Sequence, residues 1–581
     1  MAPQNKAEPN NGNEVSWVEQ HNADSSQTSS DSGMPATKGH GKVKGRVAGG
    51  VYLQTVNAEA TTGSDHGPLK EVECDMPLTN TEIVHKDGEE FILLKFAPGD
   101  KENPFNWPNA KKWFMSWLLC LMTLTIGLAT TAYSSGISSM CSDFGVSSEL
   151  GQLGLFFFNF VCAMSPMFLA PFCELVGRKV IYVGAYCCFC ITFIGLALGK
   201  NIGTILVMRA FLGLFGCVGT ILVGGTFDDM FEPRERSRAM ALFSYVAILG
   251  TVAAPIYAGF IDETIGWRWV EGIQGLSCVP LLIVLVIFFR ETRGGVTLAK
   301  RAKQLRATTN DQRYKAEQEL IAKDIKQMLN ASSVKAVKML ASEGVVLAFG
   351  LWISFAWFLT FLFLSVIPIT FQEHHGWSEG VAGLPYISLC LGTTIGYGAN
   401  FFQIKRYEGL VRANNGNVEP EARLFGALFG APFLPIGLFI YTYTQYAFVH
   451  WMGPVVGLAL IAIGIFFIFE SCYSFTADCY GTNSSSAIAG QGLMRNTLAA
   501  VSPLFGSQFF HNLGSQWAGL LLSLVAVLLT FIPFVVYKYG PAIRARSKLA
   551  QSTAADDESS EEEVSEIEDE KAGAELSIPQ H

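Results

Sequence analysis

Apolar stretches of about twenty residues recur between Trp113 and Tyr537, and this pattern constrains the fold more than any other feature of the chain. A helix that rises about 1.5 Å per residue crosses a hydrocarbon core of roughly 30 Å in such a stretch. Only 16% of the 581 residues are charged, whereas a soluble chain carries about 25%. The sequence therefore predicts an all-α membrane protein.

Twelve transmembrane helices are predicted, six on each side of a polar central segment. They cover residues 113–133, 150–172, 180–199, 203–227, 239–260, 269–289, 345–368, 381–404, 424–444, 452–477, 486–508 and 515–537. This division predicts an N-terminal six-helix half over 101–290 and a C-terminal six-helix half over 344–548. Two such halves are typical of transporters built from internal repeats.

The distribution of Lys and Arg predicts how the spans are oriented. One set of loops carries nearly all of the loop cations, whereas the loops on the opposite side carry only Lys200 and Arg268. Because loops rich in Lys and Arg stay in the cytoplasm, we expect both termini to be cytoplasmic. The sequence thus predicts a multi-pass protein, which we expect to be a monomer in the plasma membrane.

The polar segments outside the spans differ in composition. Residues 1–100 lack the apolar core of a signal peptide and are expected to be disordered, with short order possible over 89–100. Residues 549–581 are strongly acidic and account for the net charge of −9; they predict a solvated tail, or a docking or phosphorylated segment. In the cytoplasmic loop 291–343, apolar and cationic residues alternate at helical spacing, which predicts a tether that also lies along the membrane surface.

Several chemistries find no support in the sequence. Cys187, Cys188 and Cys190 lie in an apolar span without the spacing or partners of a zinc site. There is no phosphate-binding Gly-x-x-x-x-Gly-Lys-Ser/Thr loop, and no cluster of catalytic side chains. The sequence predicts no metal, cofactor or nucleic-acid partner, and neither an enzyme nor an ATP-driven pump.

A short charged connection between the second and third spans reads FCELVGRKV. Glu174, Gly177, Arg178 and Lys179 match the loop motif of the major facilitator superfamily, in which an acid precedes Gly-Arg-Lys, although Ala170 replaces the usual first glycine. The acid can pair with the cations, or with a helix N-terminus, in one conformation only. These four residues are therefore gating candidates, although the two cations could serve only to set topology.

Two further motifs strengthen the resemblance, which covers residues 101–549 and is closest to the fungal twelve-span drug:proton antiporters. MRAFLGLFG resembles the Arg-x-x-x-Gly motif that this family associates with proton coupling, and it places Arg209 inside a span. LGTVAAPIYAGF resembles the antiporter signature: Gly250, Pro255 and Gly259 match it, while two alanines replace glycines. The resemblance implies the major facilitator fold, with these three residues helping the helices to approach and bend.

Ionisable side chains within the spans are functional candidates by default. Glu470 could carry a proton, or it could form a structural pair with Arg495 or a neighbouring hydroxyl. Arg495 should lie near the middle of the membrane, where it could bind an anionic group. Polar and aromatic residues around them are candidates for substrate binding: Asn159, Tyr245, Tyr386, Tyr397, Tyr473, Gln491 and Asn496.

Together these features predict a proton-coupled antiporter that exports a small organic molecule, such as a drug or a fungal secondary metabolite, by alternating access. Multidrug efflux is the expected activity. Three alternatives remain open on the sequence: export of an organic acid, proton symport of a nutrient, and a membrane sensor that does not transport.

Overall fold

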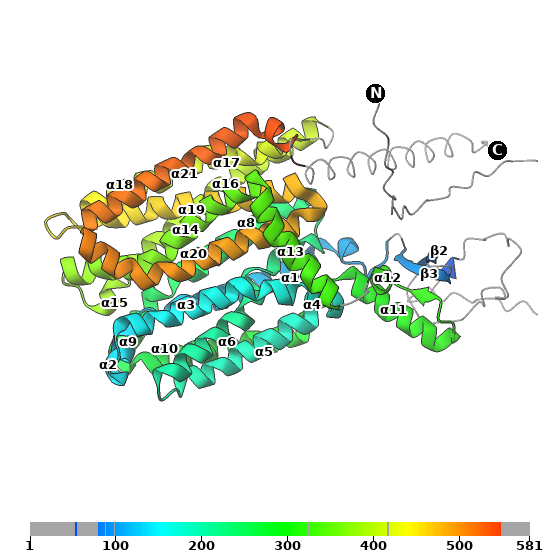
Figure 1. The fold of residues 1–581 in the computed structure, drawn as a ribbon, viewed down its shortest axis with the longest axis horizontal. Helices are drawn as coiled ribbons and strands as arrows, with labels where there is room; N and C mark the ends of the chain where they lie inside the picture. The colour runs from blue at the N-terminus through cyan, green and yellow to red at the C-terminus, as the bar shows by residue number, and fades with distance from the viewer. Residues whose placement is uncertain are drawn as a thin grey trace, which may run out of the picture. The chain divides into compact units, whose positions relative to one another are not determined.

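The computed structural model describes residues 53–54, 79–86, 89–97, 99–321, 325–414, 418–545 and 547 (Figure 1). The predicted acidic tail and most of residues 1–100 lie outside the described residues. Helices make up almost all of the described chain, and the one sheet within it is small.

Helices α1 to α10 form the first half of the membrane body. Their bounds are α1 Asn109–Ala132, α2 Ile137–Phe144, α3 Ser148–Met164, α4 Pro166–Val176, α5 Arg178–Ala197, α6 Ile202–Thr220, α7 Val223–Asp228, α8 Pro233–Ala253, α9 Pro255–Ile265 and α10 Trp267–Phe288. Within this half, α1 packs against α8 and α10, and α6 packs against α3 and α5.

The second half repeats this design. It contains α14 Gly344–Pro368, a π-helical turn Ile369–His374, α15 Glu379–Ala382, α16 Tyr386–Ala413, a 3-10 turn Pro420–Leu424, α17 Phe425–Gly430, α18 Phe433–Thr444, α19 Met452–Tyr480, a 3-10 turn Gly481–Asn483, α20 Ser484–Leu513 and α21 Ser515–Arg544. Here α14 packs against α20, and α19 packs against α16 and α18 (Figure 1).

Prolines divide two of the predicted spans. Pro166 begins α4 directly after α3, and the two helix axes differ by 46°. Pro255 begins α9 directly after α8. A proline has no backbone N–H to donate and crowds the preceding turn, so a helix interrupted there bends. Each bent pair still covers one predicted span.

All twelve predicted ranges are helical, but not all of them are apolar enough to be identified as spans from length and composition. In the described chain nine helical segments meet that standard, or ten when the bent pair α3–α4 is included. The remaining two are α16 and α20, which have 28 and 30 residues and carry more polar side chains. Polar residues of both helices are buried against neighbouring helices, among them Asn400 on α16 and Gln491 on α20.

The halves meet along three pairs of long helices. Helix α3 packs against α20, and α8 packs against α16 and α19. The faces turned away from these contacts expose large apolar side chains, including Leu528 and Phe531 on α21 and Ile287 on α10. Exposed apolar faces of this extent suit a lipid environment.

The central loop does not have the form that the sequence suggested. Helix α11 (Gly294–Thr309) packs on a sheet that contains β2 (Thr79–Lys86), β3 (Glu89–Phe96) and β4 (Tyr314–Lys315). Strands β2 and β3 pair antiparallel, while β3 pairs in parallel with β4; a two-residue strand β1 (Leu53–Gln54) joins β2. We call the unit of β2, β3, α11, β4 and α12 (Glu317–Ile321) the loop module.

The expectation that α11 lies on the membrane surface was wrong. Its apolar residues Ala302 and Leu305 are buried against Ile92, Leu94 and Tyr314 of the sheet. The helix is amphipathic, as predicted, but its apolar face is covered by strands from far upstream in the chain. The structure also extends order in the N-terminal region beyond 89–100, to include β2. Helix α13 (Ile325–Ser342), in contrast, packs on α4, α14 and α20.

Candidate functional site

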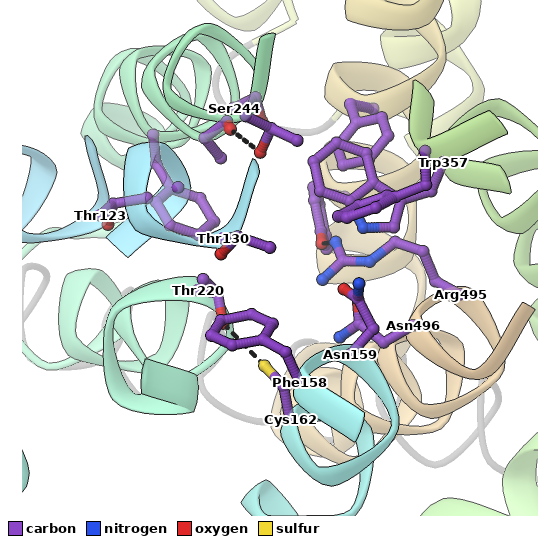
Figure 2. A pocket seen from close by; sticks show the side chains of 17 residues that line it. Thr123, Thr130, Phe158, Asn159, Cys162, Thr220, Ser244, Trp357, Arg495 and Asn496 are labelled. Carbon is purple, nitrogen blue, oxygen red and sulfur yellow. Dashed lines mark hydrogen bonds between the residues drawn. The ribbon is translucent and has the colours of Figure 1, made fainter. Parts of the chain in front are cut away.

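A cavity lies between the two halves and receives side chains from both (Figure 2). It is lined by seventeen residues, most of them apolar or aromatic, with a few polar groups among them. Helices α1, α3, α6 and α8 line one side, and α14, α19 and α20 line the other. The lining residues are Thr123, Gly127, Thr130, Phe158, Asn159, Cys162, Thr220, Phe243, Ser244, Ala247, Thr251, Trp357, Phe361, Phe469, Tyr473, Arg495 and Asn496.

Arg495 is the only charged side chain among the described residues that line this cavity. Its Nη1 donates to the hydroxyl of Tyr473, and its guanidinium lies 5.4 Å from the ring centre of Trp357 and 5.5 Å from that of Phe469. The side chain is buried, and Nε has no hydrogen-bond partner. Arg495 forms no ion pair with a described carboxylate, so neutral groups alone surround its charge.

Four of the eight predicted substrate residues line the cavity. Asn159 donates from Nδ2 to the carbonyl of Leu155 at 3.1 Å, whereas the Nδ2 of Asn496 is buried without a partner. Tyr473 and Arg495 complete the four. The cavity therefore brings together residues from α3, α19 and α20.

The other four predicted substrate residues lie outside this lining. Tyr245 and Tyr397 stack on each other across the halves, with ring centres 4.7 Å apart. Tyr386 donates to the carbonyl of Phe363 at 3.1 Å. Gln491 donates to the hydroxyl of Thr476 at 3.1 Å. These four side chains are engaged in helix packing.

A second cavity begins where the central one ends. It contains about 1020 Å³ of empty space, and it shares Phe243, Tyr473 and Arg495 with the central cavity. Its lining includes Ser333 and Ala336 of α13, so it lies towards the end of the bundle that carries the central loop. We call this end of the membrane body the loop end.

Arg209 lies behind the wall of the central cavity. It is fully buried and donates to three backbone carbonyls, those of Gly154 at 3.4 Å, Ala129 at 3.2 Å and Thr130 at 2.8 Å. The ring of Phe158 lies 5.2 Å from its guanidinium. Since Thr130 and Phe158 both line the cavity, one layer of residues separates Arg209 from its interior.

Glu271 is a buried neighbour of Arg209 that the sequence did not single out. The charges of the two residues interact, and Oε1 of Glu271 has no hydrogen-bond partner. The signal available in the sequence was an acid inside an apolar run. Because Glu271 is the third residue of the predicted span 269–289, it was expected near the membrane surface and was not chosen as a candidate. The structure buries it on α10, facing α6.

Glu470 lies apart from Arg495 and does not line either cavity. Its Oε1 accepts a hydrogen bond of 2.8 Å from Ser474, Oε2 has no partner, and Asn400 lies beside the carboxylate. Of the alternatives left open for Glu470, the structure contains the pair with a hydroxyl and lacks the pair with Arg495.

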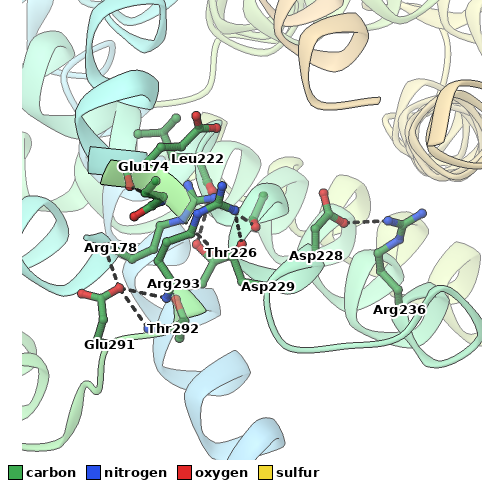
Figure 3. Close-up of polar contacts among 12 residues, drawn as sticks. Glu174, Arg178, Leu222, Thr226, Asp228, Asp229, Arg236, Glu291, Thr292 and Arg293 are labelled. Atoms are coloured by element: carbon green, nitrogen blue, oxygen red, sulfur yellow. Dashed lines mark hydrogen bonds and ion pairs between the residues drawn. The ribbon is translucent and has the colours of Figure 1, made fainter. Parts of the chain in front are cut away.

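The charged connection between α4 and α5 is held by acids from elsewhere in the first half (Figure 3). Arg178 forms an ion pair of 2.9 Å with Asp229, which also pairs with Arg293 at 2.9 Å. Glu291 accepts from the backbone N–H of Arg178 at 2.8 Å and of Lys179 at 3.1 Å. A carboxylate in this position stabilises the N-terminus of α5.

Glu174 does not make the contact that the motif suggested. Its side chain lines the second cavity, and its carbonyl accepts a hydrogen bond of 2.9 Å from Gln318 of the loop module. In this conformation Asp229 pairs with the cation, and Glu291 binds the helix N-terminus, the two contacts that the motif acid was expected to make. Gly177 is required by geometry: its φ is 108°, and an added Cβ would lie 2.4 Å from Glu291 Oε2.

The signature residues in α8 and α9 lie at close helix contacts. A Cβ on Gly250 would lie 2.9 Å from the carbonyl oxygen of Leu124 on α1, and one on Gly259 would lie 3.0 Å from that of Glu379 on α15. Pro255 marks the break between the two helices. Helix α9 thus approaches the second half closely at the end of the bundle opposite the loop end.

Two helical halves around a shared cavity are the architecture of a membrane transporter. The family follows from comparison: residues 119–491 match the model of the Major Facilitator Superfamily. The chain belongs to this superfamily, and it is a multi-pass membrane transporter of small organic molecules, not an enzyme. The predicted family and fold are confirmed.

Similar proteins include fungal transporters. The Ascochitine biosynthesis cluster MFS transporter of Didymella fabae is 32% identical over 502 residues, which cover 85% of this chain and 97% of that one. A multidrug transporter of Candida glabrata is 31% identical over 461 residues, covering 79% and 81%. The human organic anion transporter MFSD10 has the same fold, with a TM-score of 0.52 at 13% identity, over 74% of this chain and 100% of that one.

Proposed function

We propose that the protein is a proton-coupled antiporter that exports a small organic molecule by alternating access. In this proposal the loop end faces the cytoplasm, both termini are cytoplasmic, and a monomer in the plasma membrane is the transport unit. Relatives named as an efflux pump, a multidrug transporter and a biosynthetic-cluster transporter support export.

The observation that carries the proposal is a cavity between the halves with contacts across the halves at both of its ends. At the loop end, Arg238 of α8 forms an ion pair of 2.5 Å with Glu408 of α16. At the opposite end, Glu263 of α9 accepts a hydrogen bond of 2.9 Å from the N–H of Gly380 on α15. Alternating access requires that such contacts break at one end while they hold at the other.

Arg209 and Glu470 are the proposed proton-coupling groups. Both are buried ionisable side chains in the apolar body, where a charge persists only with a compensating partner. Arg209 has Glu271 beside it, so a proton on that carboxylate would change the field that Arg209 experiences. The gating role proposed for Glu174, Gly177, Arg178 and Lys179 places the change of conformation at the α4–α5 connection.

Metabolite profiles of cells with and without the gene, each measured with and without a proton gradient, test this function. We expect a compound to accumulate inside cells that lack the gene, and also when the gradient is collapsed. Accumulation outside such cells would instead favour the nutrient symporter. If neither pool changes for any compound while a cellular response is lost, the sensor is favoured.

The variant Arg209→Ala tests the coupling more narrowly. We expect it to reach the membrane and to lose proton-driven flux. Flux equal to that of the unaltered protein would remove Arg209 from the mechanism.

A further inference from the structure

We propose that the central cavity selects organic monoanions: molecules with one carboxylate or other acidic group on an apolar, preferably aromatic, body. This inference rests on the proposed export function and adds the chemical class of its substrate. Arg495 is the residue that we assign to the acidic group.

The first argument is the state of the four buried arginines in the membrane body, of which Arg423 is neutralised by Asp478 at 2.6 Å. Arg178 is neutralised by Asp229 at 2.9 Å. Arg209 donates to three backbone carbonyls and lies near Glu271. All three therefore have the partners that a structural arginine in an apolar interior requires.

Arg495 lacks such partners, although its side chain is only 4% exposed. Its one hydrogen-bond acceptor among the described residues is the neutral hydroxyl of Tyr473, which occupies Nη1. Guanidinium groups have five N–H donors in a planar fork, and Nε remains without a partner. A carboxylate that approaches this side of the fork would form a charge-assisted pair of hydrogen bonds.

The second argument is the character of the neighbouring polar groups. Asn496, next to Arg495 on α20, has a buried Nδ2 without a partner, and it lines the same cavity. Both of these groups are donors, and the third unpartnered group of the lining, the hydroxyl of Ser244, can donate as well. In the close view Arg495 extends towards Asn159 and Asn496 (Figure 2). A ligand group placed here must accept hydrogen bonds, as a carboxylate does.

The third argument concerns what the lining excludes. No Asp or Glu occurs among the described residues that line the central cavity. A cationic ligand would therefore meet a like charge in a medium of low dielectric, without an acid to hold it. A ligand with several negative charges would find only one cation. The single charge of Arg495 thus favours a monoanion.

The body of the ligand follows from the rest of the wall. Six aromatic side chains line the cavity: Phe158, Phe243, Trp357, Phe361, Phe469 and Tyr473. Such walls bind apolar and aromatic bodies and leave specificity to a few polar groups.

Arg495 also lies on the route into the cavity. With Phe243 and Tyr473 it belongs to the linings of both the central and the second cavity. A molecule that moves from the loop end to the centre therefore passes the guanidinium. The site can select the acidic group at entry and hold it at the centre.

Three probes with one body test the inference: 2-naphthoate, 2-naphthamide and 2-naphthylmethylamine, titrated into the purified full chain by calorimetry. Charge-assisted hydrogen bonds predict that the carboxylate binds about 10- to 100-fold tighter than the amide. We expect the amine to bind most weakly. Equal binding of acid and amide, stronger binding of the amine, or no saturable binding of the acid would overturn the inference.

Variants identify the residue responsible. Arg495→Gln should remove the preference for the acid while it keeps binding of the amide, and Arg495→Lys should restore part of the preference because it returns the charge without the fork. Arg412→Gln is the matched control, since it removes one positive charge from a side chain that is 83% exposed. An unchanged preference in Arg495→Gln would refute the assignment.

Flux in proteoliposomes separates this inference from the proposed function. Proton-driven flux of the acid and the amide at equal rates would refute the anion selectivity and leave the antiporter standing. If the acid binds in a way that depends on Arg495 but no flux is driven by a proton gradient, the antiporter is refuted and the anion selectivity stands.

Discussion

The loop module depends on one arginine with two acidic partners in different environments. Arg301 of α11 pairs with Asp100 at 2.6 Å and with Glu102 at 2.7 Å; the Asp100 side chain is 1% exposed and that of Glu102 is 52% exposed. Burial works to lower the pKa of Arg301, but the hydrogen bonds that it donates to both carboxylates outweigh burial and raise the pKa above its ordinary value. The two acids bind the same arginine but differ in exposure, so mutating each in turn compares a buried ion pair with an exposed one.

We expect Asp100→Asn to open the loop module and Glu102→Gln to leave it closed. Removing one partner of a buried ion pair costs about 3–5 kcal/mol, because a charge is left without compensation. Because Arg301 keeps its contact with Glu102, we expect the loss of stability to lie at the lower end of this range, about 3 kcal/mol. A loss of that size raises the population of the opened module by more than roughly 100-fold. An exposed pair is worth about 0–1 kcal/mol, so Glu102→Gln should raise that population by less than about 10-fold.

Hydrogen exchange of the full chain, followed by mass spectrometry of its peptides, measures this difference. Peptides from β3 and α11 should exchange faster in Asp100→Asn, since exchange reports local opening. Peptides from α14 and α20 serve as internal controls and should not change. Equal protection of the module in both variants would refute the argument that burial makes Asp100 the stronger partner.

Three further predictions concern single residues of the membrane body and its ends. Gly177→Ala should lower the midpoint of thermal unfolding, because its φ of 108° is strained for alanine and its Cβ would meet Glu291; Gly184→Ala, in open space on α5, should not. Burial and neighbouring carboxylates raise the pKa of Glu379 to about 7, so the closed α9–α15 contact should be most stable below about pH 5 and weaken as the pH rises through 7. Cross-linking of the two helices against pH measures this, and Glu379→Gln should abolish the dependence. Glu470→Gln should keep the fold, as the amide oxygen can still accept from the hydroxyl beside it, and should lose proton-driven flux in proteoliposomes; full flux would exclude a proton-carrying role.

The spans were predictable because each one is a local pattern. All twelve predicted ranges lie on helices, including those of α16 and α20, which are more polar than the other ten. Proline predicted the break at Pro255, since its effect on the helix is also local; the break at Pro166 was not predicted.

The cavity was predictable only in part, because the direction in which a side chain points depends on the rotation of its helix within the bundle. Tyr473 and Gln491 are both polar residues of predicted spans, yet Tyr473 lines the cavity and Gln491 bonds to Thr476. Nothing in the local sequence distinguishes these two outcomes. Arg495 was identified because a charge inside a span is rare enough to indicate a site by itself.

Partners distant in sequence could not be predicted. Asp229 and Glu291 hold Arg178 and the start of α5, but no spacing rule connects residues so far apart. The same holds for α11, whose apolar face could have met either lipid or protein. The strand that covers this face is β3, which lies far upstream in the chain. Arg301 of α11 and its partner Asp100, which follows β3, are 201 positions apart.

Arg209, one of the two proposed proton-coupling groups, and Arg495 lie in different halves, and a shared wall connects them. Arg209 belongs to the first half and Arg495 to the second, and Phe158 lies between Arg209 and the cavity, with its ring 5.2 Å from the guanidinium. A Cβ on Gly213 would lie 2.3 Å from the carbonyl oxygen of Phe158, so the backbones of α3 and α6 are in close contact at this residue. A shift of α3 at the cavity wall would therefore be passed to α6, the helix that carries Arg209. In the proposed cycle, that coupling lets a proton on one side of the wall and a substrate on the other favour different conformations.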